Sequence, residues 1–462
     1  MIDPNIFREY DIRGIVGPQL NETVVTELAK ALGIFFRRNS AESIAVGHDA
    51  RESSPRFSRL IMEVLAAGGC NVTSIGQVPT PVLYHCVFTR GFDGGVMITG
   101  SHNPADHNGF KIMLGKSALF GSQIQEIREI VQREEDRTVS DVPAGSLNAI
   151  NVVDDYIDDI VSKVSLGSRK LKVVVDGGNG MGCVTAVPIY ERLGAELITL
   201  YAEPDPAFPN HHPDPTVAEN LQDLMIKVQE SQADIGIAFD GDADRIGVVD
   251  ETGRIIWGDE LMILFARGVL AQNPGATVIG EVKCSQTLFD DIAAHGGKPI
   301  MWKAGHSLIK AKMKETNAAL AGEMSGHIFF ADRFYGFDDA AYAGARLLEI
   351  LSRTDKKISD LLADVPTLAT TPELRIDCPD DVKFAVVQQV AKGFSATHPV
   401  ITIDGARIVF EEGWGLVRAS NTQAILVLRF EAVSEKALAA IKDTVEARVD
   451  QAIMQATSSQ RD

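Results

Sequence analysis

The chain has 462 residues, of which 45% are hydrophobic and 23% charged, a composition typical of soluble globular proteins. Its length predicts about three domains, and the sequence has no apolar run of about 18 residues that would predict a membrane span. The formal net charge of −19 disfavours nucleic-acid binding, and it requires that any anionic ligand be held by locally placed Arg, Lys and backbone amide groups.

Residues 1–150 alternate between helical and strand patterns, which predicts an α/β unit with a mainly parallel sheet. In such a sheet the loops that leave the carboxyl ends of the strands form the ligand site. The expected elements are helices at about 20–38, 54–68, 81–88 and 122–135, and strands at 43–47, 71–75 and 94–98.

The last of these strands runs into the motif TGSHNP at 99–104, a small polar turn with Ser101 at its tip. Ser101 and His102 alone are a weak catalytic signal, because adjacent residues on an extended chain point to opposite faces. A turn or capping serine explains the pattern equally well. The loop at 48–51 is expected at the same sheet edge, and Lys111 follows shortly after the turn.

A glycine-rich turn marks the second unit, residues 151–253. DGGNGMG at 176–182 follows a predicted strand and precedes a predicted helix. Such a turn can bind phosphate through the amides of the helix N-terminus. The motif differs from the G-x-G-x-x-G pattern of dinucleotide sites, and close packing of the helix on the strand explains the glycines at least as well.

The motif DGDADR at 240–245 is the most informative local feature. The carboxylates of Asp240, Asp242 and Asp244 would repel one another in a tight loop unless a cation lay between them, and hard oxygen ligands suit Mg²⁺. An EF-hand is excluded, because Arg245 stands where that loop needs glycine and the flanks are strand-like. A phosphatase with Asp240 as nucleophile and a solvated loop both stay open.

The third unit, residues 254–367, repeats the alternation of strands and helices, which suggests an internal structural triplication. Its loops include KAGHS at 303–307 and GEMSGH at 322–327. The second loop offers a carboxylate, a hydroxyl and an imidazole, a set suited to the hydroxyl groups of a sugar. A surface ion pair of Glu323 with His327 explains that loop equally well.

The chain changes character after a predicted linker at 356–371. Residues 368–462 read as a small α+β domain with an antiparallel sheet. Between its strands lies RASNT at 418–422, whose basic and hydroxyl side chains could cradle a phosphate. A polar hairpin turn is an equally good reading of this segment.

The chain carries five motifs in a fixed order: FREYDIRG at 7–14, TGSHNP, DGDADR, GEMSGH and RASNT. On these motifs it resembles the α-D-phosphohexomutase superfamily, and most closely its bacterial phosphomannomutase/phosphoglucomutase branch. The resemblance covers essentially the whole chain. It implies a heart-shaped fold of three similar mixed α/β domains and a smaller C-terminal α+β domain. The expected domains are 1–150 with a phosphoserine loop, 151–253 with a metal loop, 254–367 with a sugar loop and 368–462 with a phosphate loop.

The resemblance also implies roles for individual residues. Ser101 would be the phosphorylated serine, and one Mg²⁺ would be held by a phosphoserine oxygen with Asp240, Asp242 and Asp244. The further catalytic residues would be Arg13, His102, Lys111 and Arg245. The substrate would contact Tyr10, Lys303, His306, Glu323, Ser325, His327, Arg418, Ser420, Asn421 and Thr422.

The activity so implied is reversible phosphoryl transfer between C1 and C6 of a hexose phosphate, through a hexose 1,6-bisphosphate that also acts as activator. The general base is His102 or Lys111. TGSHNP and GEMSGH favour mannose and glucose phosphates, although KAGHS replaces the KTGHS that is frequent in close relatives. Phosphoglucosamine mutase, a metal-dependent sugar-phosphate phosphatase and a non-catalytic sugar-phosphate sensor remain alternatives.

The expected partners are small hexose phosphates, with no nucleic acid, no membrane and a monomeric chain. The N-terminus shows no secretory pattern, and the five scattered cysteines are typical of reduced thiols in a cytoplasmic protein. The last domain, behind its linker, is expected to close over the site and shield the phosphoserine from water.

Overall fold

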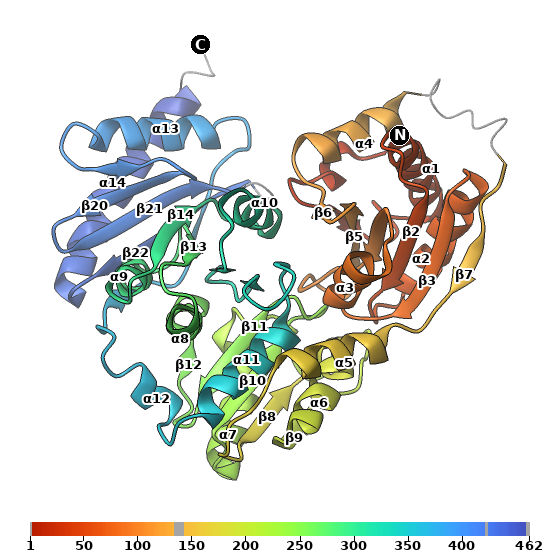
Figure 1. The fold of residues 1–462 in the computed structure, drawn as a ribbon. Helices are drawn as coiled ribbons and strands as arrows, with labels where there is room; N and C mark the ends of the chain where they lie inside the picture. The colour runs from red at the N-terminus through yellow and green to blue at the C-terminus, as the bar shows by residue number, and fades with distance from the viewer. Residues whose placement is uncertain (1, 134–142, 421–423, 459–462) are drawn as a thin grey trace.

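The computed structural model describes residues 2–133, 143–420 and 424–458, and these residues form four β-sheets that follow one another along the chain. Figure 1 shows a heart-shaped outline in which the N-terminal and C-terminal sheets belong to the two upper lobes and the second and third sheets connect them. The predicted four-part α/β architecture is confirmed.

The first sheet has the strand order β1 (Ile12–Ile15), β5 (His107–Leu114), β4 (Gly94–Ile98), β2 (Ser43–His48), β3 (Asn71–Gln77) and β7 (Leu147–Ala149), with β6 (Ser117–Ala118) beside β5. The strands β2, β3, β4 and β7 run parallel, whereas β5 runs antiparallel to β1, β4 and β6. The sheet is therefore mixed, and the expected parallel order holds for its centre and for the edge that β7 forms.

Helices cover both faces of the first sheet. They are η1 (Pro4–Ile6), α1 (Glu22–Arg38), α2 (Ser54–Ala67), α3 (Thr80–Arg90) and α4 (Ser122–Gln132). Because strand side chains alternate between faces, Ile44 and Val46 enter the core beneath α1, α2 and α4, while Ala45 enters the core beneath α3. The helix α1 begins where the Asn21 side chain accepts a hydrogen bond from the backbone N–H of Val24.

The second sheet has the order β12 (Ile255–Ile256), β11 (Ile246–Asp250), β10 (Ile235–Phe239), β8 (Lys172–Asp176) and β9 (Glu196–Leu200), with helices α5 (Val153–Lys163), α6 (Gly182–Leu193), η3 (Ala218–Leu221) and α7 (Gln222–Ser231). The glycines before α6 permit close packing: an added Cβ would lie 2.9 Å from Gly241 at Gly180, and 2.5 Å from the Phe239 side chain at Gly182. This geometry supports the packing interpretation of DGGNGMG.

The third sheet has the order β14 (Lys298–Trp302), β13 (Thr277–Glu281), β15 (Leu320–Gly322) and β16 (Ile328–Phe330), with helices α8 (Gly258–Gln272), α9 (Gln286–Ala294), α10 (His306–Thr316) and α11 (Ala340–Ser352). The helix α8 carries little helical periodicity in its sequence and is not predicted from it, because its buried residues form an almost continuous apolar run. The other helices alternate with the strands, as the sequence pattern predicts.

The fourth sheet is antiparallel throughout, as predicted. It contains β17 (Ala369–Thr370), β18 (Leu374–Asp377), β19 (Val400–Ile401), β20 (Ala406–Phe410), β21 (Gly413–Ala419) and β22 (Ile425–Ala432), with α13 (Lys383–Phe394) and α14 (Glu435–Ser458). The predicted linker at 356–371 is partly folded. It contains α12 (Ile358–Leu361), anchored by the buried Ile358, and β17, which pairs with β22.

The cores show which parts of the molecule are fused. One continuous core joins α3 and part of the first sheet to the second and third sheets. The fourth sheet has its own core with α13 and α14, and among the described residues only a small apolar cluster of Val282, Trp414 and Leu416 joins it to the third. The C-terminal part is therefore the one least tied to the others by apolar contacts.

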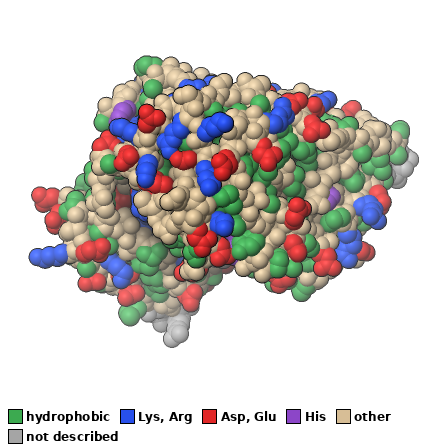
Figure 2. Space-filling view, turned by 90° about the horizontal axis from the view of Figure 1, so that it is seen from below, with side chains coloured by type: hydrophobic (Ala, Val, Ile, Leu, Met, Phe, Trp, Pro, Cys, Tyr) green, Lys and Arg blue, Asp and Glu red, His purple; other side chains and the backbone are tan. Residues whose placement is uncertain are grey.

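Three surface and chemical properties complete the description. Acidic and basic side chains are interspersed on the face in Figure 2. All five cysteines are buried and form no disulfide. Within the described ranges, none of the helices combines the length and apolar character that crossing a bilayer requires.

Candidate active site

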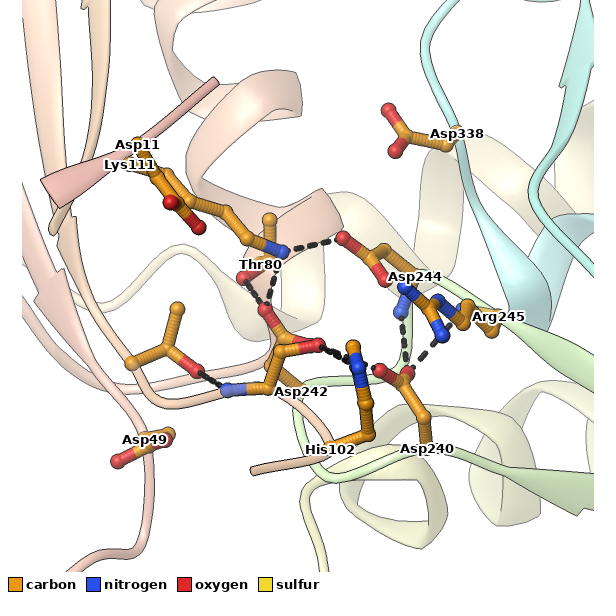
Figure 3. A network of polar contacts seen from close by, with 12 residues as sticks. Asp11, Asp49, Thr80, His102, Lys111, Asp240, Asp242, Asp244, Arg245 and Asp338 are labelled. Atoms are coloured by element: carbon orange, nitrogen blue, oxygen red, sulfur yellow. Dashed lines mark hydrogen bonds and ion pairs between the residues drawn. The ribbon is translucent and has the colours of Figure 1, made fainter. Parts of the chain in front are cut away.

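Three carboxylates form the centre of the site, on the turn between β10 and β11. Asp240, Asp242 and Asp244 are each 0% exposed, and one oxygen from each lies within 4.8 Å of the others, an arrangement that could hold a metal ion. Figure 3 shows Lys111 approaching this group from the first sheet and Arg245 from the same turn.

Protein donors satisfy only part of this carboxylate cluster. Asp242 Oδ2 accepts hydrogen bonds from Lys111 Nζ at 2.6 Å and Thr80 Oγ1 at 2.5 Å, and Lys111 also pairs with Asp244. The Oδ1 atoms of Asp242 and Asp244 are buried without a hydrogen-bond partner. Buried, unpartnered carboxylate oxygens are hard ligands, so this donor set fits a divalent cation such as Mg²⁺.

Burial and crowding shift the ionisation of these groups. Burial and the charges of Asp244 and Asp242 raise the pKa of Asp240 well above its usual value. Burial acts in the same direction on Asp242, but the Lys111 ammonium outweighs it and lowers the pKa of that carboxyl. Burial alone would lower the pKa of Lys111, yet Asp242 and Asp244 raise it well above the usual value, so the Lys111 side chain is a cation.

Ser101 lies directly against the carboxylates. Its Oγ donates to Asp240 Oδ2 at 2.8 Å and lies 3.1 Å from His102 Nδ1. The expectation that the side chains of Ser101 and His102 point to opposite faces is wrong. Ser101 has the left-handed φ of +48°, so the chain is not extended at this point. The single hydroxyl proton goes to Asp240, so His102 Nδ1 carries the hydrogen in the other contact and Nε2 is the basic nitrogen.

Two further groups surround His102. Burial, together with the positive charges of Arg245 and Arg13, lowers the pKa of His102 well below its usual value, so the ring is neutral. Arg13 comes from β1 and pairs with Asp11 at 2.5 Å. The antiparallel pairing of β1 with β5 places Arg13 beside Gly109, two residues from Lys111.

The GEMSGH loop is joined to the carboxylate turn. Arg245 Nε donates to His327 Nε2 at 2.9 Å, and the backbone N–H of Ile246 donates to Gly326 O. Glu323 and His327 are 5% and 4% exposed, and Glu323 Oε2 lies 4.0 Å from His327 Nε2. Both side chains are therefore buried, and the interpretation as a pair on the protein surface is wrong. Glu323 Oε1 instead accepts from the backbone N–H of Gly305 at 2.6 Å, which ties this loop to KAGHS.

Asp338 is a residue that the sequence analysis missed. Its carboxylate accepts from Lys310 at 2.8 Å and lies 3.0 Å from His327 Nδ1 and 3.5 Å from His306 Nδ1. Asp338, His327 and Asp244 form a second group with metal-ligand spacing. Because His327 Nε2 accepts from Arg245, its Nδ1 carries the ring hydrogen, and this nitrogen is not a metal ligand in that tautomer.

The KAGHS loop is where the first and fourth units meet. Tyr10 Oη donates to Ala304 O at 2.9 Å, and Ala304 N–H donates to Asp404 Oδ2 at 3.1 Å. The same Asp404 oxygen accepts from Arg418 Nε at 2.6 Å, so Asp404 orients the predicted phosphate-binding arginine. The Tyr10 and His306 rings meet edge to face at 6.0 Å, and Lys303 is exposed beside them.

The remaining predicted residues are located as follows. Ser325 is half-buried in the GEMSGH turn, and the backbone N–H of Ser420 donates to Ile425 O in the fourth sheet. Asn421 and Thr422 lie outside the described residues. The sequence does not predict a role for four further residues of the site: Arg51, Thr80, Asp338 and Asp404. Their partners are distant in sequence and no local pattern marks them, although the loop at 48–51 is expected at the ligand edge.

Four family models match consecutive parts of the chain. They are described as phosphoglucomutase/phosphomannomutase alpha/beta/alpha domain I at residues 4–138, domain II at 154–253, domain III at 257–368 and the C-terminal domain at 373–448. The chain belongs to the phosphoglucomutase/phosphomannomutase family. The resemblance drawn from the five sequence motifs is thereby confirmed.

Individual members of the family match over nearly their whole length. A phosphomannomutase/phosphoglucomutase from Pseudomonas putida is 48% identical over 440 residues, covering 95% of this chain and 94% of that protein. A phosphoglucomutase from Neisseria gonorrhoeae is 46% identical over 452 residues, covering 97% of each. The crystal structure of a phosphoglucomutase/phosphomannomutase family protein from Burkholderia thailandensis superposes with a TM-score of 0.91 at 43% identity, covering 98% of both chains.

Proposed function

We propose that the protein catalyses reversible phosphoryl transfer between C1 and C6 of mannose and glucose phosphates, with Ser101 as the phosphoryl carrier and a hexose 1,6-bisphosphate as intermediate and activator. The observation that carries the proposal is the contact of Ser101 Oγ with Asp240, inside a buried cluster of three carboxylates. The names and near-complete coverage of its relatives support the same activity.

The cluster of Asp240, Asp242 and Asp244, with an oxygen of phosphorylated Ser101, would hold one Mg²⁺. Bound there, the ion supplies positive charge that offsets the charge of the transferred phosphoryl group. Thr80 and Lys111 orient Asp242 from the second coordination layer, and two backbone amides hold Asp240 Oδ1. The unpartnered Oδ1 atoms of Asp242 and Asp244 support this assignment.

His102 is the proposed base, because its Nδ1 lies 3.1 Å from Ser101 Oγ and its Nε2 is left to accept a proton. In the first half-reaction a bond forms between the sugar hydroxyl oxygen and phosphorus, and the bond from Ser101 Oγ to phosphorus breaks. Nε2 takes the proton of the sugar hydroxyl, and Nδ1–H gives its proton to the departing serine oxygen. The bisphosphate then turns end for end. In the second half-reaction Ser101 Oγ gives its proton to Nδ1 and bonds to the other phosphorus, while Nε2–H gives its proton to the departing sugar oxygen.

Lys111, the alternative base, is the weaker candidate, since its ammonium is engaged with Asp242 and Asp244. With Arg13 and Arg245 it supplies fixed positive charge around the transferred group. This arrangement revises the role of His102, which serves the leaving serine oxygen as well as the sugar hydroxyl.

The rest of the site would orient the sugar and its second phosphate. Arg418, held by Asp404, grips the phosphate that is not transferred, together with Ser420 and the proposed contacts Asn421 and Thr422. Glu323 and Ser325 read the sugar hydroxyls. Three side chains around the KAGHS loop would complete the substrate contacts: Tyr10, Lys303 and His306, with the neighbouring imidazole of His327.

The phosphatase alternative is disfavoured by the surroundings of Asp240. Its Oδ1 accepts two backbone N–H groups, and its Oδ2 accepts from Ser101 and is the oxygen left to hold the metal ion, so Asp240 is placed as a ligand beside the Ser101 hydroxyl rather than as the nucleophile. Comparison of kcat/KM for mannose, glucose and glucosamine 1-phosphates separates the two sugar branches. A sensor would bind these ligands without turnover.

Intact mass spectrometry of the purified protein tests the carrier. We expect the wild type to carry one phosphoryl group after incubation with glucose 1,6-bisphosphate, and Ser101→Ala to carry none and to lose activity. Ser58→Ala, another buried serine of the first unit, is the control and should behave like the wild type. An active Ser101→Ala variant would contradict the proposal.

We also propose that the protein acts as a cytoplasmic monomer without nucleic-acid partners. The net charge of −19 supports the last of these points, because it opposes binding to a phosphate backbone. The proposed domains keep the boundaries 1–150, 151–253, 254–367 and 368–462. Size-exclusion chromatography with light scattering tests the monomer.

A further inference from the structure

A buried arginine lies behind the turn that carries Ser101. Arg51, in the loop between β2 and α2, is only 1% exposed. Its guanidinium donates hydrogen bonds to four backbone carbonyls of the turn. They are Ser101 O at 2.7 Å, Asn103 O at 2.6 Å, His107 O at 3.0 Å and Pro104 O.

Asp49 completes this contact from the same loop. Its Oδ2 lies 3.3 Å from Arg51 Nε and accepts from the backbone N–H of Gly100 at 3.2 Å. Its Oδ1 accepts from the backbone N–H of Arg51 and from Ser54 Oγ. Asp49 therefore holds the backbone N–H of Gly100, the residue before Ser101, while Arg51 holds the backbone carbonyl of Ser101 and three carbonyls that follow it.

The fit between arginine and turn is close. An added Cβ at Gly100 would lie 2.5 Å from Arg51 Cζ, so any side chain there would displace the guanidinium. Four carbonyl dipoles that converge on one point repel one another unless a cation lies between them. A planar guanidinium with five N–H donors satisfies them all, whereas a lysine ammonium has three donors at a single point.

The held turn has an unfavourable backbone conformation that matters for the chemistry. Ser101 is a non-glycine residue at φ +48°, a conformation that persists only where the surroundings over-determine it. That same φ turns Oγ toward Asp240 and His102. On the far side, an added Cβ at Gly241 would lie 2.4 Å from Ser101 O, so the turn is confined between Arg51 and the carboxylate loop.

We infer that Arg51 is a positioning residue for phosphoryl transfer: it holds the 100–107 turn so that Ser101 Oγ faces the carboxylate cluster. The inference rests on the proposed function, because it assigns Arg51 to the same carrier. Arg51 touches no reacting atom. Its effect should therefore fall on the rate of transfer and leave the sugar and phosphate contacts of the third and fourth units unchanged.

The test compares Arg51→Lys with a matched buried arginine. Arg346 is 3% exposed, pairs with Asp332 through both terminal nitrogens and stacks on Phe330, in the third unit. We expect Arg51→Lys to lower kcat about 100-fold, the scale of a misplaced reacting group, with KM within about threefold of the wild type. Arg346→Lys should lower the melting temperature and keep kcat per folded molecule.

Quench-flow measurement of transfer from phosphorylated Ser101 to glucose 1-phosphate locates the effect. The rate constant should fall with kcat in Arg51→Lys. A wild-type rate constant in folded Arg51→Lys overturns the inference. If Arg51→Lys fails to fold, Asp49→Asn decides: a lower kcat at unchanged KM supports the inference, and an unchanged kcat overturns it.

The two proposals fail in different ways. If the wild type carries no phosphoryl group and Ser101→Ala is active, the proposed function fails, and the role of Arg51 falls with it. If the wild type is a phosphoserine enzyme and Arg51→Lys transfers at the normal rate, only the inference about Arg51 fails.

Discussion

Replacement of Asp339 by Asn should change how stability depends on pH. Asp339 is 1% exposed; it caps α11 by accepting from the backbone N–H of Tyr342, and it accepts from Tyr156 Oη at 2.9 Å. Burial is the largest cause that raises the pKa of this carboxyl from 3.8 to about 7. Asn keeps the cap and the shape but cannot ionise.

The size and sign of the effect follow from proton linkage. The folded protein holds a proton on Asp339 that the unfolded chain releases above pH about 4. The free energy of unfolding therefore includes the full contribution of neutral Asp339 below pH about 4. As pH rises toward 7 this contribution is lost by about 1.4 kcal/mol per pH unit, and by about 4 kcal/mol in all. At pH 8, Asp339→Asn should be more stable than the wild type by up to that amount.

Urea unfolding of both proteins between pH 4.5 and 8 measures the difference, and subtraction removes the titration of all other groups. Tyr190→Phe is the control, since Tyr190 Oη donates to the backbone oxygen of Ala341 and leaves Asp339 its partners. It should keep the wild-type slope. A difference between wild type and Asp339→Asn that does not vary with pH would refute the reasoning.

Three further predictions concern the active site. Thr80→Val removes the hydroxyl that donates to Asp242 and should weaken Mg²⁺ activation about 10- to 100-fold. Thr89→Val, on the same helix, should leave Mg²⁺ activation unchanged. Equal Mg²⁺ titrations for the two variants would contradict this prediction. Asp404→Asn should raise KM about tenfold with little change in kcat, because Arg418 loses a charge-assisted partner; steady-state kinetics with an unchanged KM would exclude it. Removal of metal with EDTA should abolish activity, and Mg²⁺ should restore it.

The sequence predicted the architecture and the loops of the site because both follow from local rules. Buried strands read as apolar runs, and the polar motifs that follow them must lie at strand ends. Thus TGSHNP follows β4, DGDADR joins β10 to β11, and GEMSGH follows β15. Three aspartates at alternate positions predict a cation site, and their carboxylates lie in one buried group with metal-ligand spacing.

What the sequence could not predict depends on distant partners. Ser101 makes hydrogen bonds with Arg51, 50 residues earlier, and with Asp240, 139 residues later. Asp338 and Asp404 carry no local signal, because an aspartate in a loop is most often solvated. The secondary structure failed where periodicity was weak, at the continuously apolar α8 and in the partly folded linker at 356–371.

The KAGHS loop explains how a C-terminal unit with its own core can still share one site. Ala304 accepts from Tyr10 of the first unit and donates to Asp404 of the fourth, so a single residue carries both contacts. The Asp404 contact is one backbone hydrogen bond, worth about 1 kcal/mol net, and Asp404 also holds Arg418. If the fourth unit moved away, Ala304 would lose that bond while Asp404 kept Arg418 in place. Arg418, the proposed phosphate contact, and Asp404 would therefore move together, as the proposed closure over a substrate held at its far end requires.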